Sequence, residues 1–229
     1  MIVVKNLVKT IETPTHRVEI LRDISFEVPA AQVVAFMGPS GSGKTTLLGM
    51  LAGLDWPTSG SVLVDGIEIT ELGEDELATI RGRKMGFVFQ AYQLMPALTA
   101  MENILLPSEM AGEGANGVRG RARELLEGVG LLDREDHYPA QLSGGEQQRV
   151  AIARAFMMEP AVLLADEPTG NLDSTNGKHI LELLLKLNEE RGTTLVLVTH
   201  DQELAAHADR RILMRDGQIV HDEMAASDP

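Results

Sequence analysis

The feature that most constrains the fold is an eight-residue motif at positions 38–45. It reads Gly-Pro-Ser-Gly-Ser-Gly-Lys-Thr and fits G-x-x-x-x-G-K-[ST], a loop whose backbone N–H groups surround the phosphates of a nucleotide. The apolar run 32–37 before it is typical of a buried strand, and the apolar run 47–52 after it is typical of a helix. A strand, a glycine loop and a helix in this order are the context that the motif requires. The sequence therefore predicts an α/β fold with a nucleotide site at the start of a helix.

The residues of this loop have distinct expected roles. Successive backbone N–H groups and the positive end of the helix dipole would face phosphate oxygens. Lys44 would reach the β- and γ-phosphates, and the hydroxyl of Thr45 would ligate Mg²⁺. The predicted phosphate-binding residues are Gly38, Pro39, Ser40, Gly41, Ser42, Gly43, Lys44, Thr45 and Thr46.

The composition is that of a soluble globular protein. Hydrophobic residues make up 44% of the 229 positions and cysteine is absent, which is consistent with a reducing compartment. No apolar run approaches the roughly 20 residues that span a bilayer, and the first residues lack the apolar core of a signal peptide. The net charge of −14 argues against a general nucleic-acid binder, which would carry a basic patch. We therefore expect a membrane role only through a partner.

The chain divides into a β-rich start, a helical middle and an alternating end. The predicted strands are 2–7, 17–28, 33–37, 62–64, 66–70, 85–89, 162–165, 194–199 and 211–214. The predicted helices are 47–52, 99–110, 118–129, 143 to about 158, 174–190 and 201–208. Asp65-Gly66 predicts a hairpin turn, Thr99 with Glu102 predicts a capping box, and the segment 112–117 and the tail after Gln218 are expected to be flexible.

These elements predict one domain with three parts. Alternating strands and helices favour a phosphate-loop NTPase core with a largely parallel sheet. An N-terminal antiparallel β subdomain belongs to that core, which comprises 1–89 and 142–229. An inserted α-helical subdomain would comprise 90–141.

Two carboxylates follow an apolar strand and could complete the nucleotide site. Asp166 and Glu167 come directly after the run 162–165. Because side chains alternate across a strand, we expect the two to face different directions if the strand geometry persists. Asp166 would hold Mg²⁺, directly or through water, and Glu167 would polarise the water that attacks the γ-phosphate. Alone, such a pair is more often a solvated loop start; the phosphate loop favours the functional interpretation.

Two further polar residues leave the predicted sheet at the carboxyl ends of strands. His200 follows the run 194–199 and precedes Asp201, a predicted helix N-cap, while Gln90 follows 85–89. Ligands of open α/β folds bind at this edge. Each residue alone is more often an ordinary polar loop residue.

The segment 142–149, Leu-Ser-Gly-Gly-Glu-Gln-Gln-Arg, narrows the class of protein. Ser143 and Glu146 form a capping-box pattern. Gly144 and Gly145 each cost a helix about 1 kcal/mol, which is understandable if a bulky anion must approach the backbone. Since the chain already has one phosphate loop, we interpret Ser143, Gly144 and Gly145 as a second anion site that contacts a nucleotide held by another chain.

With these motifs the chain resembles the ATP-binding subunits of ABC transporters. The segment 142–148 is the diagnostic element, because other phosphate-loop NTPases lack it. The other motifs follow in the family's order: the phosphate loop, the Q-loop residue Gln90, the signature 142–148, Asp166-Glu167, the D-loop 171–173 and the H-loop residue His200. The segments 86–90, 141–155 and 165–173 are similar to the lipoprotein-releasing and macrolide-exporter group, including a stand-alone bacterial ATPase subunit that pairs with a large permease.

The resemblance implies an ATPase that uses ATP and Mg²⁺. It implies catalytic roles for Glu167, His200, Lys44 and Gln90. It implies metal ligation by Thr45, Gln90 and Asp166. It places each nucleotide between the phosphate loop of one copy and Ser143, Gly144 and Gly145 of a second copy, in a head-to-tail homodimer.

The resemblance also implies a separate integral membrane permease and no nucleic-acid partner. The protein would then be cytoplasmic and peripheral on the inner membrane, with export, lipid or lipoprotein extraction, or mechanical signalling as its work. Gln90 would sense the γ-phosphate, and Tyr92, Leu94, Met95 and Leu98 would receive a segment of the permease. The run 94–98 could instead belong to the core.

One departure from the family concerns the base of the nucleotide. The family usually stacks adenine on an aromatic residue near the N-terminus, whereas this chain offers Ile11, Pro14 and His16 there. We expect Ile11 or His16 to contact adenine, which leaves selectivity for ATP over GTP open.

Two alternative functions remain at this stage. A soluble ABC ATPase of DNA repair or translation usually has long insertions or tandem units, which this single acidic unit lacks. A small-molecule kinase could use the same phosphate loop, but the signature segment argues against it.

Overall fold

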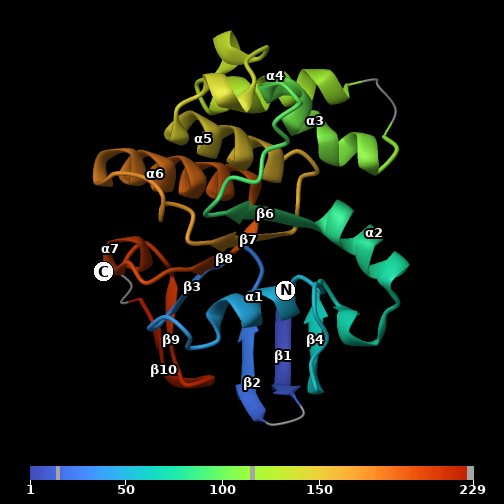
Figure 1. Cartoon of the computed structure of the whole chain (residues 1–229), viewed down its shortest axis with the longest axis vertical. Coiled ribbons are helices and arrows are strands. Elements are labelled where there is room, and N and C mark those ends of the chain that lie inside the picture. Colours follow the sequence, from blue (N-terminus) through green and yellow to red (C-terminus); the bar gives the residue numbers. More distant parts are fainter. Residues whose placement is uncertain (14–15, 114–116, 226–229) are drawn as a thin grey trace. The chain divides into compact units, whose positions relative to one another are not determined.

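The structure is a computed structural model that describes residues 1–13, 16–113 and 117–225. Its contacts divide the chain into two compact units, of which the first comprises Met1–Ala78 with Thr193–Pro229 and the second Thr79–Gly192. In Figure 1 the first unit contains the blue and red elements, and the second contains the green to orange ones. The predicted boundaries of a helical subdomain at 90 and 141 stay a prediction; that segment belongs to the second unit.

The first unit contains a four-stranded antiparallel sheet in the order β2-β1-β4-β5. Its strands are β1 (Ile2–Glu12), β2 (Arg17–Val28), β4 (Ser59–Val64) and β5 (Ile67–Glu68). Ile2 lies opposite Val28 on one side and Val64 on the other, and all three are at most 1% exposed. The predicted antiparallel β subdomain is confirmed. Its hairpin turn has Asp65 and Gly66 at φ of 50° and 76°, the conformation that an Asp-Gly turn adopts.

The first unit also contains four neighbouring strands in the order β10-β9-β3-β8. They are β3 (Val33–Met37), β8 (Thr194–Val198), β9 (Arg210–Arg215) and β10 (Gln218–Met224). β3 pairs in parallel with β8 and β9, whereas β10 is antiparallel to β9. The helices α1 (Lys44–Leu51) and α7 (Gln202–Ala205) pack on β8 and β3 respectively. Because parallel strands are covered by helices, β3 and β8 are apolar almost throughout, which is why their sequences predicted them well.

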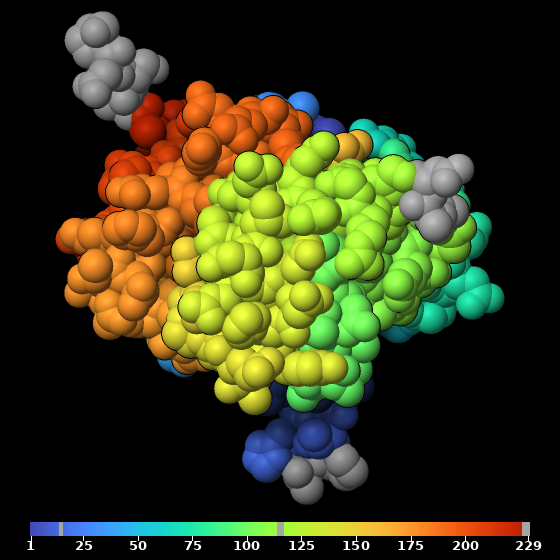
Figure 2. Space-filling model, turned by 90° about the horizontal axis from the view of Figure 1, so that it is seen from above, coloured from blue at the N-terminus to red at the C-terminus, as the bar shows by residue number. Residues whose placement is uncertain are grey.

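In the second unit a parallel pair of strands carries a layer of helices. The strands are β6 (Met85–Phe89) and β7 (Val162–Asp166), with Phe89 opposite Asp166. The helices are α3 (Ala100–Met110), α4 (Val118–Gly128), α5 (Gly144–Ala155) and α6 (Ser174–Arg191), with short 3₁₀ turns at Leu132–Arg134 and Pro139–Gln141. α5 is the central helix, because β6, α3, α4 and α6 all pack against it. Figure 2 shows one face of this unit, with the segment from α3 to α5 in green to yellow.

Several elements differ from the prediction. The tail after Gln218, expected to be mobile, forms β10, which the ion pair between Arg210 and Asp222 holds to β9. The helix α2 (Glu74–Lys84) was not predicted, because Leu77 is its one buried residue among the described ones. The strand expected at 66–70 becomes a 3₁₀ turn, Ile69–Glu71, after two residues. Flexibility was expected at 112–117, but residues 114–116 of that segment lie outside the described residues. Pro14, mentioned above for the adenine site, also lies outside them.

Candidate nucleotide-binding site

The phosphate loop joins β3 to α1 in the first unit (Figure 1). Gly43 is the N-cap of α1 at a φ of 99°, and a Cβ there would lie 2.9 Å from the side chain of Leu21 in β2. Gly38 has a φ of 146°, and a Cβ there would overlap the carbonyl oxygen of Met214 in β9. Only glycine fits both positions. The backbone of the loop is therefore held closely between β2 and β9.

The start of α1 suits an anion. In the described loop and helix, Gly43 provides no side-chain cap and the first turn contains no acidic residue. The first N–H groups of a helix have no intrahelical acceptor, and the helix dipole adds positive charge at this end. A phosphate group satisfies both requirements at once.

Lys44 lies inside the loop rather than in solvent. It is 8% exposed, and its Nζ donates to the carbonyl oxygens of Gly38 at 2.8 Å and Pro39 at 3.0 Å. A phosphate oxygen would compete for the same ammonium through a charge-assisted bond, which is stronger than a bond to a neutral carbonyl. The neighbouring Thr45 is exposed, so its hydroxyl is accessible to a ligand.

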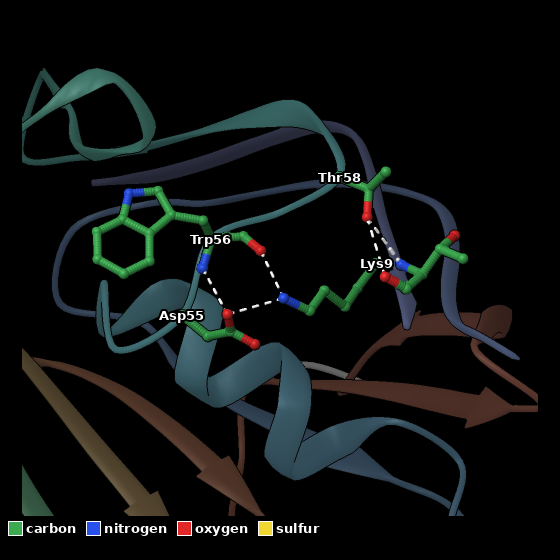
Figure 3. Close-up of polar contacts among 5 residues, drawn as sticks. Lys9, Asp55, Trp56 and Thr58 are labelled. Carbon is green, nitrogen blue, oxygen red and sulfur yellow. Dashed lines mark hydrogen bonds and ion pairs between the residues drawn. The ribbon is translucent and has the colours of Figure 1, made fainter. Parts of the chain in front are cut away.

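The loop that follows α1 is held by a half-buried lysine of β1, as Figure 3 shows. Nζ of Lys9 donates to Oδ1 of Asp55 at 2.7 Å and to the carbonyl of Trp56 at 2.8 Å. The same carboxylate accepts from the N–H of Trp56 at 2.8 Å. The indole of Trp56 points away from this cluster and is 47% exposed. Both ends of α1 are thus tied to the antiparallel sheet.

The start of α5 in the second unit is built differently. The hydroxyl of Ser143 accepts from the N–H of Glu146 at 3.3 Å, and the Glu146 carboxylate accepts from the N–H of Ser143 at 2.8 Å. This predicted capping box leaves the N–H groups of Gly144 and Gly145 for an external anion. The hydrogen bonds to Ser143 lower the pKa of Glu146, with Arg134 and Arg149 contributing, so a negative charge stays in this turn at neutral pH.

A groove of about 360 Å³ lies beside this turn, between α5 and α6. Ser143 and Gly145 form one part of it, and its walls carry the cationic side chains of Arg149 and Lys186 together with the carboxylates of Glu146 and Glu182. The two cations offset the two carboxylates for an approaching anion.

Asp166 ends β7, but the chain does not continue as a strand. Glu167 has a φ of 46°, in the left-handed region that non-glycine residues seldom adopt. We expected Asp166 and Glu167 to face different directions only if the strand continued through Glu167, and the strand ends at Asp166. Such a conformation costs on the order of 1 kcal/mol and is concentrated at functional sites, so it supports a special role for Glu167.

The structure brings Gln90 together with the D-loop. Nε2 of Gln90 donates to Oδ1 of Asn171 at 3.1 Å, and Nδ2 of Asn171 donates to the carbonyl of Gln90 at 2.8 Å. A Cβ on Gly170 would lie 2.8 Å from the Gln90 amide, so a side chain at this position would displace the amide. The buried side chain of Gln148 in α5 donates to the carbonyl of Pro168 in the same region. The sequence suggested a D-loop at Asn171 by resemblance, but no pattern in it indicated these contacts.

The remaining predicted residues are distributed as follows. His200 is exposed after β8, and Asp201 caps α7 as predicted, accepting from the N–H of Glu203 at 2.8 Å. Ile11 is 47% exposed and lies opposite Val18, which is 54% exposed. His16 is exposed as well.

Of the predicted docking residues, Met95 is 48% exposed, whereas Tyr92, Leu94 and Leu98 are half-buried. The run 94–98 is therefore not simply core.

Comparison with known proteins identifies the class. The family model described as ABC transporter matches residues 21–170. Over 220 residues the chain is 48% identical to the lipoprotein-releasing system ATP-binding protein LolD of Syntrophus aciditrophicus, covering 96% of this chain and 99% of that protein. Over 222 residues it is 48% identical to the macrolide export ATP-binding/permease protein MacB of Brucella melitensis, covering 97% of this chain but 34% of that protein. The dimeric post-hydrolysis structure of the ATP-binding cassette MJ0796 with ADP and Pi is 43% identical, with a TM-score of 0.91 and full coverage of both chains.

The chain therefore belongs to the ABC transporter family, as an ATP-binding cassette. The predicted likeness to the lipoprotein-releasing and macrolide-exporter group is confirmed, and so is the predicted ABC ATPase fold. Membership of this family favours transport over DNA repair, translation or a small-molecule kinase. The roles assigned to single residues stay predictions.

Proposed function

We propose that this chain binds and hydrolyses ATP as one of two copies that drive a separate permease. The observation that carries the proposal is the pair of helix starts, α1 and α5, each with backbone N–H groups left for an anion. One chain needs only one phosphate loop to hold a nucleotide. A second helix start whose N–H groups are left for an anion is explained if it contacts the γ-phosphate of a nucleotide held by another copy.

In this proposal the phosphate loop holds the triphosphate and Lys44 contacts the β- and γ-phosphates. Thr45, Gln90 and Asp166 would hold Mg²⁺. Hydroxyl, amide and carboxylate oxygens are the hard donors that this ion prefers, and nucleotide phosphates and water usually supply its other ligands. Among the described residues no cluster of three or more His, Cys, Asp or Glu side chains could hold a metal ion, which is consistent with an ion bound mainly through its nucleotide. When bound, the ion would neutralise charge on the phosphates.

Hydrolysis would then depend on four side chains. The carboxylate of Glu167 would accept a proton from the attacking water, and His200 would contact the γ-phosphate. Lys44 would stabilise the charge of the transferred phosphoryl group. Gln90 would report the presence of the γ-phosphate through its contact with Asn171.

The dimer would depend on ATP. Two copies of net charge −14 repel each other, although salt screens this beyond about 8 Å. A γ-phosphate at the start of α5 would stabilise the pair by roughly 0.3–2 kcal/mol per site. Loss of that phosphate on hydrolysis would weaken the pair. The related cassette solved as a dimer with ADP and Pi supports the pairing of two copies.

The permease would dock on Tyr92, Leu94, Met95 and Leu98. No helix among the described residues is both long and apolar enough to span a membrane. The relatives named for lipoprotein release and macrolide export favour a cytoplasmic subunit that its permease holds at the inner membrane and that works in export or lipoprotein extraction. The segment 90–141 would serve as the helical subdomain.

The base of the nucleotide would contact aliphatic rather than aromatic side chains. β2 touches the phosphate loop at Leu21 and continues to Val18, about 10 Å away, which is of the order of the distance from phosphates to base. There Val18 and Ile11 form an exposed apolar pair, with His16 as the alternative contact. Aliphatic contacts do not read the edges of a base, so we expect weak discrimination between ATP and GTP.

The proposed nucleotide site is tested by Lys44→Ala. The variant loses the one ammonium inside the described phosphate loop, so ATP affinity and hydrolysis should fall by at least roughly 100-fold, as loss of a stabilising charge does in other enzymes. The exposed Lys5 in the same unit provides the control Lys5→Ala, which should behave as the wild type. Binding is measured by calorimetry and turnover by phosphate release. Undiminished turnover in Lys44→Ala would contradict the assignment.

A further inference from the structure

One short segment, residues 92–95, has a conformation that depends on a half-buried arginine of α5. Tyr92 and Gln93 are consecutive non-glycine residues with φ of 55° and 51°. Left-handed conformations of this kind cost roughly 1–2 kcal/mol per residue. The segment needs an external partner to keep this backbone.

Arg154, in the last turn of α5, is that partner. Its Nη1 donates to the carbonyl of Gln93 at 2.6 Å and its Nη2 to the carbonyl of Tyr92 at 2.9 Å. The rigid guanidinium fork can hold both carbonyls at once, which a lysine cannot do. Burial lowers the pKa of Arg154, yet a guanidinium keeps its proton in proteins. Its position in the last turn also places the charge at the negative end of the helix dipole.

Tyr92 connects this anchor to the other end of α5. A Cβ built on Gly144 would lie 2.8 Å from the Tyr92 hydroxyl, so the end of the phenol lies beside Gly144 in the first turn of the helix. The backbone of the same residue is held by Arg154, ten positions further along the helix. An anion that contacts Gly144 therefore has to contact or displace this phenol.

The other end of the segment is fixed by α3. The fully buried side chain of Asn103 accepts from the N–H of Met95 at 2.7 Å and donates to the carbonyl of Met95 at 3.2 Å. Leu94 and Met95 thus lie between two anchors, Arg154 and Asn103. A segment fixed at both ends can move only together with the helices that hold it.

We propose that Arg154 is a positioning residue that holds Tyr92 against the first turn of α5, so that an anion bound at Gly144 displaces the surface formed by Leu94 and Met95. This inference rests on the proposed function, because the anion would be the γ-phosphate of a second copy. It assigns to α5 the connection between the nucleotide and the proposed docking surface.

The test uses the full chain without its permease. Because the chain contains no cysteine, Met95→Cys introduces a single thiol for an environment-sensitive fluorophore at an exposed position. With Glu167→Gln to slow hydrolysis, addition of Mg-ATP should produce a dimer and shift the emission of the probe. Light scattering of the same sample reports the dimer independently.

Arg154→Met should preserve ATP-dependent dimerisation but weaken the emission shift of the probe. Dimerisation should occur at ATP concentrations within about 3-fold of the parent, while the emission shift should fall by at least roughly 5-fold, since coupling between sites is typically worth a factor of 5 or more. Arg154→Lys keeps the charge without the fork and should give an intermediate shift, which also serves if the methionine variant folds poorly. Arg119→Met is the matched control, because it removes an exposed arginine from α4 in the same unit, away from the proposed anion site.

Three outcomes would count against the inference. An emission shift in Arg154→Met equal to that in Arg119→Met would overturn it. So would the absence of a shift in the parent when light scattering reports a dimer. If no variant dimerises with ATP, the proposed function is overturned, and the inference with it.

Discussion

At the residue scale, the carboxylate of Glu146 has two opposing effects on the proposed anion site. It completes the capping box with Ser143 and so stabilises the start of α5. It also places a negative charge, kept by a lowered pKa, in the turn where a γ-phosphate is proposed to bind. The capping hydrogen bond needs an acceptor oxygen but no charge, so the two effects are separable.

Glu146→Gln should tighten the ATP-dependent dimer. Glutamine keeps the capping box and removes the charge, which is worth about 0.3–1 kcal/mol near a helix start, or about 2- to 5-fold in affinity. The measurement is the ATP concentration at half-maximal dimerisation in the Glu167→Gln background. Glu127→Gln on the exposed face of α4 should leave this value unchanged. Weaker dimerisation in Glu146→Gln would mean that the carboxylate itself contacts the partner.

A second residue, Asp222, makes stability depend on pH. Its two oxygens accept from Nε and Nη2 of Arg210 at 2.7 and 2.6 Å, and these bonds lower the pKa of Asp222. A carboxyl whose pKa is lower in the folded state stabilises the fold above its unfolded pKa of about 3.9, and this contribution is lost as the pH falls through the folded value.

Asp222→Asn should therefore destabilise the protein between pH 5 and 7 by an amount that does not vary with pH. The difference from the wild type should shrink below about pH 4, as Asp222 of the wild type becomes protonated. Urea midpoints at pH 7, 5 and 3.5 measure this, with the exposed Asp133→Asn as the control. A difference that grows as the pH falls would contradict the account of the ion pair.

At the element scale, α1 and α5 illustrate what the sequence could and could not predict. The strand before α1 and the strand β8 were predicted because continuous apolar runs mark strands covered by helices. The capping box of α5 was predicted from the spacing of Ser143 and Glu146. The helix α2 and the strand β10 were missed, because both are largely polar and exposed and neither shows a clear apolar period.

The side-chain contacts at the site could not be predicted from the sequence either. Gln90 and Asn171 are 81 positions apart, and Arg154 is 61 and 62 positions from the carbonyls it holds. No local pattern encodes such pairs, since they depend on how elements distant in the sequence pack. The left-handed backbone of Glu167 is likewise set by its surroundings, because the residue type disfavours it.

The loop after α1 provides a prediction at this scale. Lys9→Met removes the bonds to Asp55 and Trp56 while keeping the apolar stem, and should lower the free energy of unfolding by about 1 kcal/mol. ATP affinity should change little, because eight helical residues, about 12 Å, separate this loop from the phosphate loop. Urea denaturation and calorimetry measure the two effects, with Lys5→Met as the control. An unchanged urea midpoint would mean that solvent replaces these bonds without cost.

At the scale of the whole molecule, the proposal gives each chain the parts of two half-sites. One half-site would comprise the phosphate loop with Gln90, Asp166, Glu167 and His200, and the other would comprise Ser143, Gly144 and Gly145. In the proposed dimer each nucleotide would need residues from both copies. The strong acidity of the chain would keep copies apart until ATP is bound.

The most direct test of this account is the mass of Glu167→Gln in Mg-ATP, with and without Gly145→Glu. A side chain at Gly145 meets only an ordinary contact, 3.5 Å from Asn176, and glutamate is a better helix former than glycine, so the fold should be kept. Gly120→Glu on α4 is the matched control, because a side chain there meets no atom of the described residues within 4 Å. The account predicts twice 24.8 kDa for Glu167→Gln alone and with Gly120→Glu, and 24.8 kDa once Gly145→Glu places a negative charge at the second anion site. A dimer that forms equally well with Gly145→Glu, or a monomer in all three proteins at saturating ATP, would contradict it.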